Sequence, residues 1–422
     1  MRANGPADSG VPQREHIRAA PPGPDAVACA RTQLPVMPST DSMLDPRPHL
    51  LSLLPDELEV RLREHMVSRG QPGYRVGQVK DWIYTHLATS FHEMTNLPVA
   101  EREALDQAFR IGQPQVHTVS ISTDGTAKHL WKMADGELIE SVLIPAGDRL
   151  TLCLSSQAGC AMGCTFCATG WGGFGRQLTV DEIVTQYRSS ARWLAENGRE
   201  PITNVVFMGM GEPLANRKAV HPALTILNQG FGLGARRITV STVGVIPGIR
   251  ELAVRPEQFG LALSLHSPVE GLRAELIPLE KRYPLPELLA ALREFRDAGG
   301  RRITFEYTMI RGVNDAPELA PLLAEQAREL GAFVNLIPFN PIPDQDWLPS
   351  RPDRIEHFRR TLDEAGVSTA VREPRGRDID AACGQLRANA LVQIEGGRPR
   401  ARARSLAVSG SASRSAPSAP PG

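Results

Sequence analysis

From about residue 149 onward, short apolar runs alternate with longer stretches that have helical periodicity. The apolar runs, which predict strands, cover residues 150–154, 204–208, 237–241, 261–265, 303–310, 333–337 and 367–371. The helical stretches lie between most of these runs, at residues 180–194, 286–298, 316–330 and 355–365. Such alternation is typical of an α/β protein with a parallel sheet, open or closed into a barrel. Because ligands bind at the carboxyl ends of such strands, polar residues directly after a strand are candidate site residues.

The part of the chain before residue 149 has two different patterns. Residues 46–110 contain helical spacing at 56–66 and 76–87, which predicts a small N-terminal helical module. Residues 111–148 change to strand-like alternation at 116–121, 129–133 and 138–144, and we interpret them as a β-rich connector. The α/β domain is then expected over residues 149–395.

Both ends of the chain lack apolar periodicity. Residues 1–45 hold seven prolines and much Ala, Gly and Ser, and residues 396–422 consist largely of Arg, Ser, Ala and Pro. We expect a disordered leader and a disordered basic tail. No segment has the length and apolarity of a membrane span, and no secretory signal pattern is visible, so we expect a cytoplasmic protein.

The charge balance gives no argument for a nucleic-acid partner. The sequence holds 47 Lys and Arg against 47 Asp and Glu, for a net charge of zero. If RNA is bound, local clusters of basic residues must attract it. Candidate phosphate contacts are Arg236, Arg237, Arg301, Arg302, Arg359, Arg360, Arg372, Arg375 and Arg377.

Three of the six cysteines form a compact motif directly after the strand predicted at 150–154. Cys160, Cys164 and Cys167 have the spacing C-x3-C-x2-C. Three close thiolates suit a [4Fe–4S] cluster with one iron left open. An open iron can bind the amino and carboxylate groups of S-adenosylmethionine, and electron transfer can then break its sulfonium bond to yield an adenosyl radical.

A zinc site is the alternative interpretation of this motif. Structural zinc needs a fourth Cys or His at a suitable spacing. The 40 residues after Cys167 contain neither. The pattern therefore favours the iron–sulfur cluster.

Several further stretches, in a consistent order, resemble one known family. Cys160–Cys167 resembles the radical-SAM signature, and its surroundings resemble the RlmN family of dual-specificity RNA adenine C2-methyltransferases. The stretches that carry the resemblance are 93–97, 153–160, 209–213, 241–247, 263–266, 312–315, 335–341 and 378–386. The resemblance covers about residues 46–390. It implies a partial (β/α) barrel of radical-SAM type, with a helical RNA-binding module before it.

The resemblance also implies a set of cofactor contacts. In the family the loop that matches Gly211 and Glu212 meets the methionine end of S-adenosylmethionine. A carboxylate there can accept hydrogen bonds from the cofactor's ammonium group. Ser241, Ser264, Leu265, His266 and Asn314 follow later strands, and we expect them to contact the cofactor too.

Two cysteines and a glutamate match the family's catalytic residues. In the family one S-adenosylmethionine methylates the cysteine that matches Cys383, and the radical from a second removes a hydrogen atom from that methyl group. The carbon radical adds to adenine C2, so that RNA becomes bound to the protein. Glu140 matches the general base that removes the ring proton. Cys153 matches the cysteine that forms a transient disulfide with Cys383 and releases the product.

The resemblance therefore predicts methylation of adenosine C2 in 23S rRNA, at the peptidyl-transferase centre, and in tRNA next to the anticodon. The related resistance enzymes that methylate C8 are the nearest alternative, because they share the cluster and use their cysteines in the same way. A radical-SAM enzyme with another substrate, and an RNA-interaction protein with a structural zinc site, also remain open. We expect an electron donor such as flavodoxin or ferredoxin, and a monomer.

Overall fold

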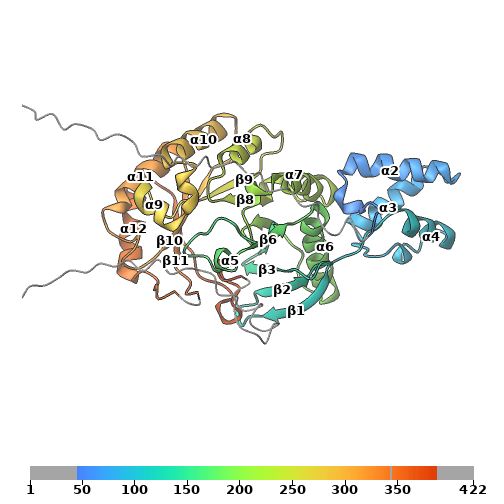
Figure 1. Ribbon diagram of the computed structural model, residues 1–422, viewed down its shortest axis with the longest axis horizontal. Coiled ribbons are helices and arrows are strands. Elements are labelled where there is room, and N and C mark those ends of the chain that lie inside the picture. Colours follow the sequence, from blue (N-terminus) through green and yellow to red (C-terminus); the bar gives the residue numbers. More distant parts are fainter. Residues whose placement is uncertain (1–44, 343–344, 387–422) are drawn as a thin grey trace, which may run out of the picture. The chain divides into compact units, whose positions relative to one another are not determined.

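The computed structural model describes residues 45–342 and 345–386 of the chain (Figure 1). The predicted leader and basic tail, and the last residues of the predicted α/β domain, lie outside this range. In the part that is described, no helix is long and apolar enough to cross a membrane.

Ten strands form one large sheet in the order β1-β2-β3-β4-β7-β8-β9-β10-β11-β12. The first four are antiparallel neighbours: β1 (Gln115–Ile121), β2 (Ala127–Lys132), β3 (Leu138–Ala146) and β4 (Arg149–Cys153). From β4 onward all neighbours are parallel, through β7 (Asn204–Phe207), β8 (Ile238–Thr242), β9 (Gly260–Ser264), β10 (Thr304–Met309), β11 (Phe333–Pro338) and β12 (Thr369–Val371). The predicted connector strands thus extend the sheet of the α/β domain, because β3 and β4 form a hairpin across residue 148.

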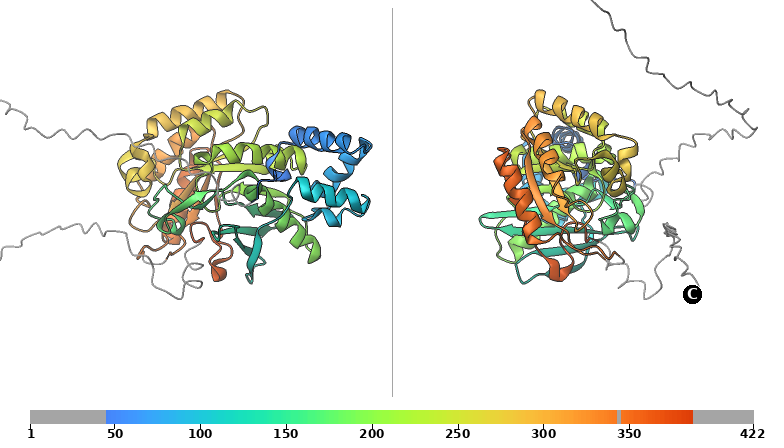
Figure 2. Two further views of the ribbon diagram at one scale, coloured as in Figure 1. Left: turned by 45° about the vertical axis from the view of Figure 1, so that its right-hand side comes forward. Right: turned by 90° about the vertical axis from the view of Figure 1, so that its left-hand side faces the viewer.

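Helices connect the parallel strands and cover one face of the sheet (Figures 1 and 2). They are α6 (Val180–Glu196), α7 (Arg217–Thr225), α8 (Ile246–Ala253), α9 (Glu270–Leu276), α10 (Leu285–Asp297), α11 (Leu319–Leu330) and α12 (Pro352–Glu364). The start of α6 shows how local sequence fixes these boundaries. Thr179 caps its first turn, and Glu182 returns a hydrogen bond to the Thr179 backbone, which is a capping box.

The N-terminal module contains α2 (Pro55–Ser68), α3 (Tyr74–Tyr84) and α4 (Val99–Ala108). The two helices predicted there are confirmed, and their buried side chains, Leu58, Leu62, Val79 and Ile83 among them, belong to the same apolar core as the barrel. Arg188 of α6 joins the two parts. Its buried guanidinium donates to the carbonyl oxygens of Ala88 (3.1 Å), Ile111 (2.7 Å) and Gly112 (2.5 Å).

The predicted strands and helices of the α/β region are all present, with boundaries shifted by a few residues. One element near the cysteine motif is additional. Strands β5 (Gln157–Gly159) and β6 (Phe174–Gln177) form a separate two-stranded sheet, and the motif and the short helix α5 (Ala168–Trp171) lie between them. This hairpin holds the motif loop beside the carboxyl ends of the parallel strands.

Candidate active site

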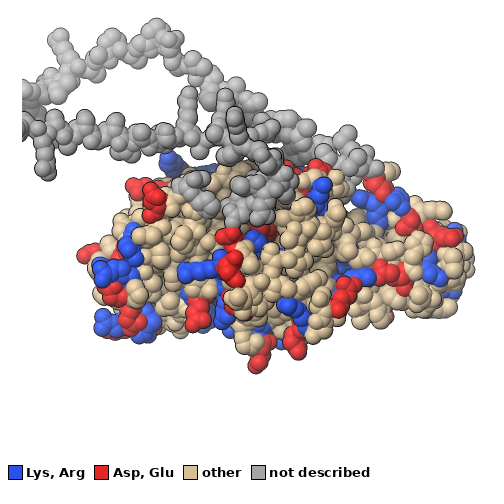
Figure 3. Space-filling model, turned by 90° about the horizontal axis from the view of Figure 1, so that it is seen from below, with Lys and Arg blue, Asp and Glu red and all other residues tan. Residues whose placement is uncertain are grey.

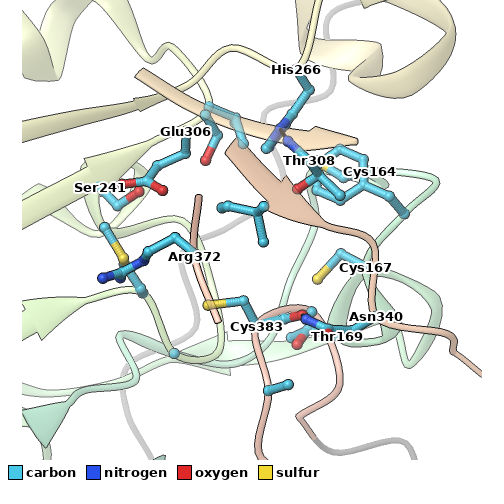
Figure 4. A pocket seen from close by; sticks show the side chains of 18 of the residues that line it. Cys164, Cys167, Thr169, Ser241, His266, Glu306, Thr308, Asn340, Arg372 and Cys383 are labelled. Atoms are coloured by element: carbon cyan, nitrogen blue, oxygen red, sulfur yellow. Dashed lines mark hydrogen bonds between the residues drawn. The ribbon is translucent and has the colours of Figure 1, made fainter. Parts of the chain in front are cut away.

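A cavity of about 400 Å³ lies at the carboxyl ends of the parallel strands (Figure 4). One residue near the carboxyl end of each strand from β7 to β12 contributes to its wall: Phe207, Ser241, Ser264, Thr308, Ile337 and Val371. The cysteine motif and the segment after β12 complete the lining. A (β/α) protein is expected to bind its ligands at this end of the sheet.

All three motif cysteines line this cavity. The loop that carries them is fixed by backbone hydrogen bonds, from Cys160 N to Gly173 O (2.9 Å) and from Thr165 N to Leu276 O (3.1 Å). Burial raises the pKa of the Cys160 thiol to about 12, and it raises the pKa of Cys164 strongly as well. The thiols are therefore protonated at neutral pH, and metal binding must displace their protons. Three sulfur donors that line one cavity are the donor set of a cluster that keeps an open iron, although within the described residues their side chains do not converge into a preformed metal site.

Gly211 and Glu212 follow β7 and reach the cavity wall. Gly211 has φ +97°, and a Cβ atom there would lie 2.5 Å from Gln157 Cβ, so glycine is required. The Glu212 carboxylate is buried and accepts hydrogen bonds from Leu214 N (3.0 Å) and Val243 N (2.9 Å). Burial raises the pKa of Glu212 to about 7 despite these bonds. A carboxylate fixed in this way is a suitable partner for a ligand ammonium group.

Ser241, Ser264 and His266, which are predicted cofactor contacts, also line the cavity. His266 has a left-handed backbone (φ +56°), and its Nδ1 accepts a hydrogen bond from Thr308 N (2.9 Å). Its ring packs edge-on against Phe166, with 4.3 Å between the ring centroids. Burial lowers the pKa of His266 to about 3, so the ring is neutral at physiological pH.

Leu265 and Asn314, which the sequence analysis expects to contact the cofactor, are not among the residues that line the cavity. The Leu265 backbone is already paired, since its N–H donates to Glu306 O and its carbonyl accepts from Arg273. The Asn314 amide is fully buried and bonded to the backbone: Nδ2 donates to His266 O (2.8 Å) and Thr308 O (2.6 Å), and Oδ1 accepts from Ile310 N (2.7 Å). Asn314 therefore holds the ends of β9 and β10 together.

Glu306, Thr308 and Asn340 are among the polar residues that line the cavity although the sequence analysis did not single them out, and Arg372, predicted there as a phosphate contact, lines the cavity as well. Asn340 follows β11 within the 335–341 stretch that resembles the family, so its position after a strand was an available signal. Its Nδ2 donates to Cys383 O (3.2 Å), and its Oδ1 accepts from Arg377 (3.1 Å). Asn340 thus connects β11 to the segment that carries Cys383.

Cys383 reaches the cavity from the segment after β12, and its sulfur points away from Cys167, toward the side of the cavity where Arg372 lies (Figure 4). One backbone and one side-chain hydrogen bond fix this segment against the cysteine loop, from Ala168 N to Gly384 O (2.7 Å) and from Thr169 Oγ1 to Leu386 O (3.3 Å). Cys383 is exposed to the cavity, where desolvation by the surrounding wall raises the pKa of its thiol and the nearby Arg372 guanidinium partly offsets this rise. Both Cys383 and the buried Cys153 are free thiols. Burial raises the pKa of Cys153 strongly, and nearby Cys383 raises it further.

Glu140 lies in β3 and is not among the residues that line the cavity. Its carboxylate is buried and forms an ion pair with Lys128, with 3.1 Å between Oε1 and Nζ. Lys128 also donates to Asp380 O (3.2 Å), three residues before Cys383. The structure thus brings the three predicted catalytic residues into one region, with Cys383 alone facing the cavity.

Two family models match the chain. The radical SAM superfamily matches residues 154–320, and the N-terminal domain of ribosomal RNA large subunit methyltransferases matches residues 54–111. A probable dual-specificity RNA methyltransferase RlmN of Gemmatimonas aurantiaca is 52% identical over 82% of this chain and 94% of its own length. The dual-specificity RNA methyltransferase RlmN of Anaeromyxobacter dehalogenans is 45% identical over 86% of this chain and 97% of its own. The chain belongs to the RlmN family.

A solved member of the superfamily has the same fold as this RlmN-family chain. The radical SAM methyltransferase from Sphaerobacter thermophilus is 44% identical, with a TM-score of 0.76, and the match covers 81% of this chain and 99% of that one. The predicted partial barrel of radical-SAM type with an N-terminal helical module is thereby confirmed. The family implies a [4Fe–4S] cluster and S-adenosylmethionine, which the cysteine motif fits.

The arginines predicted as RNA contacts of this RlmN-family chain have different partners and positions in the structure. Arg359 pairs with Glu356 and Asp363 on α12, and Arg301 donates to Arg236 O. Arg372 and Arg375 line the cavity instead. On the face shown in Figure 3, basic and acidic side chains are interspersed, so no single basic surface stands out there.

Proposed function

We propose that this chain methylates C2 of adenosine in 23S rRNA, at the peptidyl-transferase centre, and in tRNA next to the anticodon. The observation that carries the proposal is that Cys383 and the three motif cysteines face one cavity. A methyl group on Cys383 would lie where a cluster and its cofactor bind. An enzyme that only cleaves S-adenosylmethionine has no need of a fourth cysteine at this place.

Cys160, Cys164 and Cys167 would hold the [4Fe–4S] cluster, and Glu212, Ser241, Ser264 and His266 would contact S-adenosylmethionine. When bound, the cluster and cofactor supply the one-electron cleavage that removes a hydrogen atom from the methyl group on Cys383. The neutral His266 and the hydrogen-bonded Glu212 are fixed before any ligand arrives, which favours an ordered binding geometry.

Three residues of the chain would act on the RNA base. Cys383 carries the methyl-derived carbon that forms the new bond to adenine C2. Glu140 accepts the proton that leaves C2. Cys153 then attacks the sulfur of Cys383: the S–S bond forms, the S–C bond breaks, and its electron pair remains on the product carbon, which takes up a proton. The unpaired electron left from the addition of the carbon radical would return to the oxidised cluster, so that the product has only paired electrons. The nearness of Cys153 to Cys383 supports this assignment.

The remaining parts of the proposal concern partners and location. The N-terminal module at 46–110 is proposed to bind structured RNA, since it matches the N-terminal domain of ribosomal RNA methyltransferases. The cluster needs an electron donor such as flavodoxin or ferredoxin, and the disulfide needs a reductant. We infer that the protein acts as a monomer in the cytoplasm, where its RNA substrates are found.

Iron and sulfide analysis with two variants tests this proposal. We expect about four iron and four sulfide per chain after anaerobic reconstitution, and a large loss of both in Cys164→Ser. Cys383→Ala should keep the iron and the cleavage of S-adenosylmethionine but form no methylated RNA. One zinc per chain would support a structural metal site instead. Methylated RNA from Cys383→Ala would exclude the methylcysteine route.

A further inference from the structure

Lys128 of β2 is a nearly buried cation with two partners of different kinds. Its side chain is 12% exposed, and that of Glu140 is 3% exposed. The strand register explains their contact. Lys128 pairs with Val142 and Leu130 pairs with Glu140, so Lys128 and Glu140 are diagonal neighbours on one face of the β2–β3 hairpin. A lysine this deep in a protein requires a charged or polar partner.

The second partner belongs to the backbone of the Cys383 segment. Lys128 Nζ donates to Asp380 O at 3.2 Å. Asp380 has a left-handed backbone with φ +50°, an unusual conformation for a non-glycine residue that surrounding contacts must maintain. One ammonium group therefore joins the Glu140 carboxylate to a constrained residue three positions before Cys383.

The neighbouring hairpin turn holds the same segment by independent contacts. Asp378 accepts hydrogen bonds from Ser122 Oγ (2.5 Å) and Thr123 N (3.1 Å), and Gly376 N donates to Asp124 (2.9 Å). The segment is thus attached to the β1–β2 turn without Lys128. Loss of Lys128 is expected to change the position of Glu140 relative to Cys383 without releasing the whole segment.

We propose that Lys128 is a positioning residue that holds the Glu140 carboxylate against the Cys383 segment during removal of the ring proton. The inference rests on the proposed function, in which the base attached to Cys383 loses its C2 proton to Glu140. Proton transfer requires hydrogen-bond distance between acceptor and donor, and small displacements reduce rates strongly. Lys128 does not line the cavity and contacts the reaction only through the Glu140 carboxylate, so its effect passes through Glu140.

Two stages of the reaction should respond differently to the loss of Lys128. Methylation of Cys383 by S-adenosylmethionine does not involve Glu140, so it should not depend on Lys128. Release of RNA from its covalent link to Cys383 follows proton removal, so it should depend on Lys128. A purely structural ion pair would affect both stages through loss of folded protein.

The test compares Lys128→Met, Lys128→Arg and Lys132→Met in the reconstituted full-length protein. Lys132 lies at the exposed end of the same strand and is the matched control. Peptide mass spectrometry without RNA measures methylation of Cys383. Denaturing gels with unmodified ribosomal RNA measure the covalent adduct and its release.

Lys128→Met is expected to methylate Cys383 like the wild type but to release RNA roughly 10- to 100-fold more slowly, so the adduct accumulates. Lys128→Arg, which keeps the cation, should restore a large part of the rate, and Lys132→Met should match the wild type. Release by Lys128→Met within twofold of wild type would overturn the proposal, as would a parallel loss of Cys383 methylation and of thermal stability. If the wild-type protein itself forms no RNA adduct, the proposed function fails first, and this role of Lys128 with it.

Discussion

Replacing Asn314 by alanine tests whether this residue is structural or binds the cofactor. The structure shows three hydrogen bonds from its buried side chain to backbone groups of His266, Thr308 and Ile310, at 2.6–2.8 Å. Each such bond contributes about 1 kcal/mol net, and each buried group left without a partner costs about 1–3 kcal/mol. We therefore expect Asn314→Ala to lower the free energy of unfolding by about 3–5 kcal/mol.

Urea denaturation of the purified protein, followed by tryptophan fluorescence, measures this loss. The transition midpoint should fall while the slope with urea stays the same, because the surface exposed on unfolding hardly changes. Asn197→Ala is the control. That side chain makes one exposed hydrogen bond, to Trp193 O (2.8 Å), and its loss should cost about 0.5 kcal/mol or less.

A different result would show that Asn314 binds the cofactor. If Asn314→Ala unfolds within about 1 kcal/mol of the wild type but no longer binds S-adenosylmethionine, then Asn314 is a cofactor contact, and the structural role derived from its hydrogen bonds is wrong. Asn340→Ala provides the comparison within the cavity. It should lose turnover with a smaller effect on stability, because its amide lies at the cavity wall.

Two further predictions concern a loop and a buried histidine. Gly211→Ala should weaken binding of S-adenosylmethionine about tenfold or more, measured by equilibrium dialysis, because the new Cβ would displace Gln157 and disturb Glu212. Gly232→Ala, which also has positive φ but meets no atom within 4 Å, should leave binding unchanged; equal binding by both variants would refute the argument. Burial lowers the pKa of His129 from 6.5 to about 4. The unfolded chain therefore takes up this proton first as pH falls, and the folded state should lose about 3 kcal/mol of stability between pH 6.5 and 4. Urea titrations of His129→Asn at pH 6.5 and pH 4 should no longer show this loss of stability. If the variant loses as much stability as the wild type, His129 is not its source.

Most of the fold follows from patterns visible in the sequence. Runs such as 204–208 and 333–337 are short and apolar and lie between amphipathic stretches, so strands and helices can be distinguished by length and period. The β5–β6 hairpin was not predicted, because strands of three and four residues have too few positions to show alternation. Its loop is held by contacts distant in sequence, such as Thr165 N to Leu276 O, which no local pattern indicates.

The site was predictable in its cysteines and less so in its polar residues. The spacing of Cys160, Cys164 and Cys167 indicates cluster chemistry by itself. Asn314 and Asn340 both follow strands, and sequence position cannot tell which side chain turns back to the backbone. Asn in a Gly-Val-Asn-Asp turn competes readily for backbone hydrogen bonds, and this is the role that Asn314 has in the structure.

The Lys128 contact shows a second limit of sequence reasoning. Glu140 was predicted as a base from its resemblance to the family, but its partner lies twelve residues earlier on another strand. Only the hairpin register brings Lys128 beside it. The same ammonium group reaches Asp380, more than 250 residues away in sequence, and such a contact depends on the whole sheet being formed.

The most direct test of the central claim is nucleoside mass spectrometry of unmodified ribosomal RNA after anaerobic incubation with the iron-reconstituted protein, S-adenosylmethionine and a reductant. The account predicts 2-methyladenosine, absent when Cys383→Ala replaces the wild type. Formation of 8-methyladenosine instead would place the chemistry at C8, and no methylated adenosine despite an intact cluster and cofactor cleavage would contradict the proposed function.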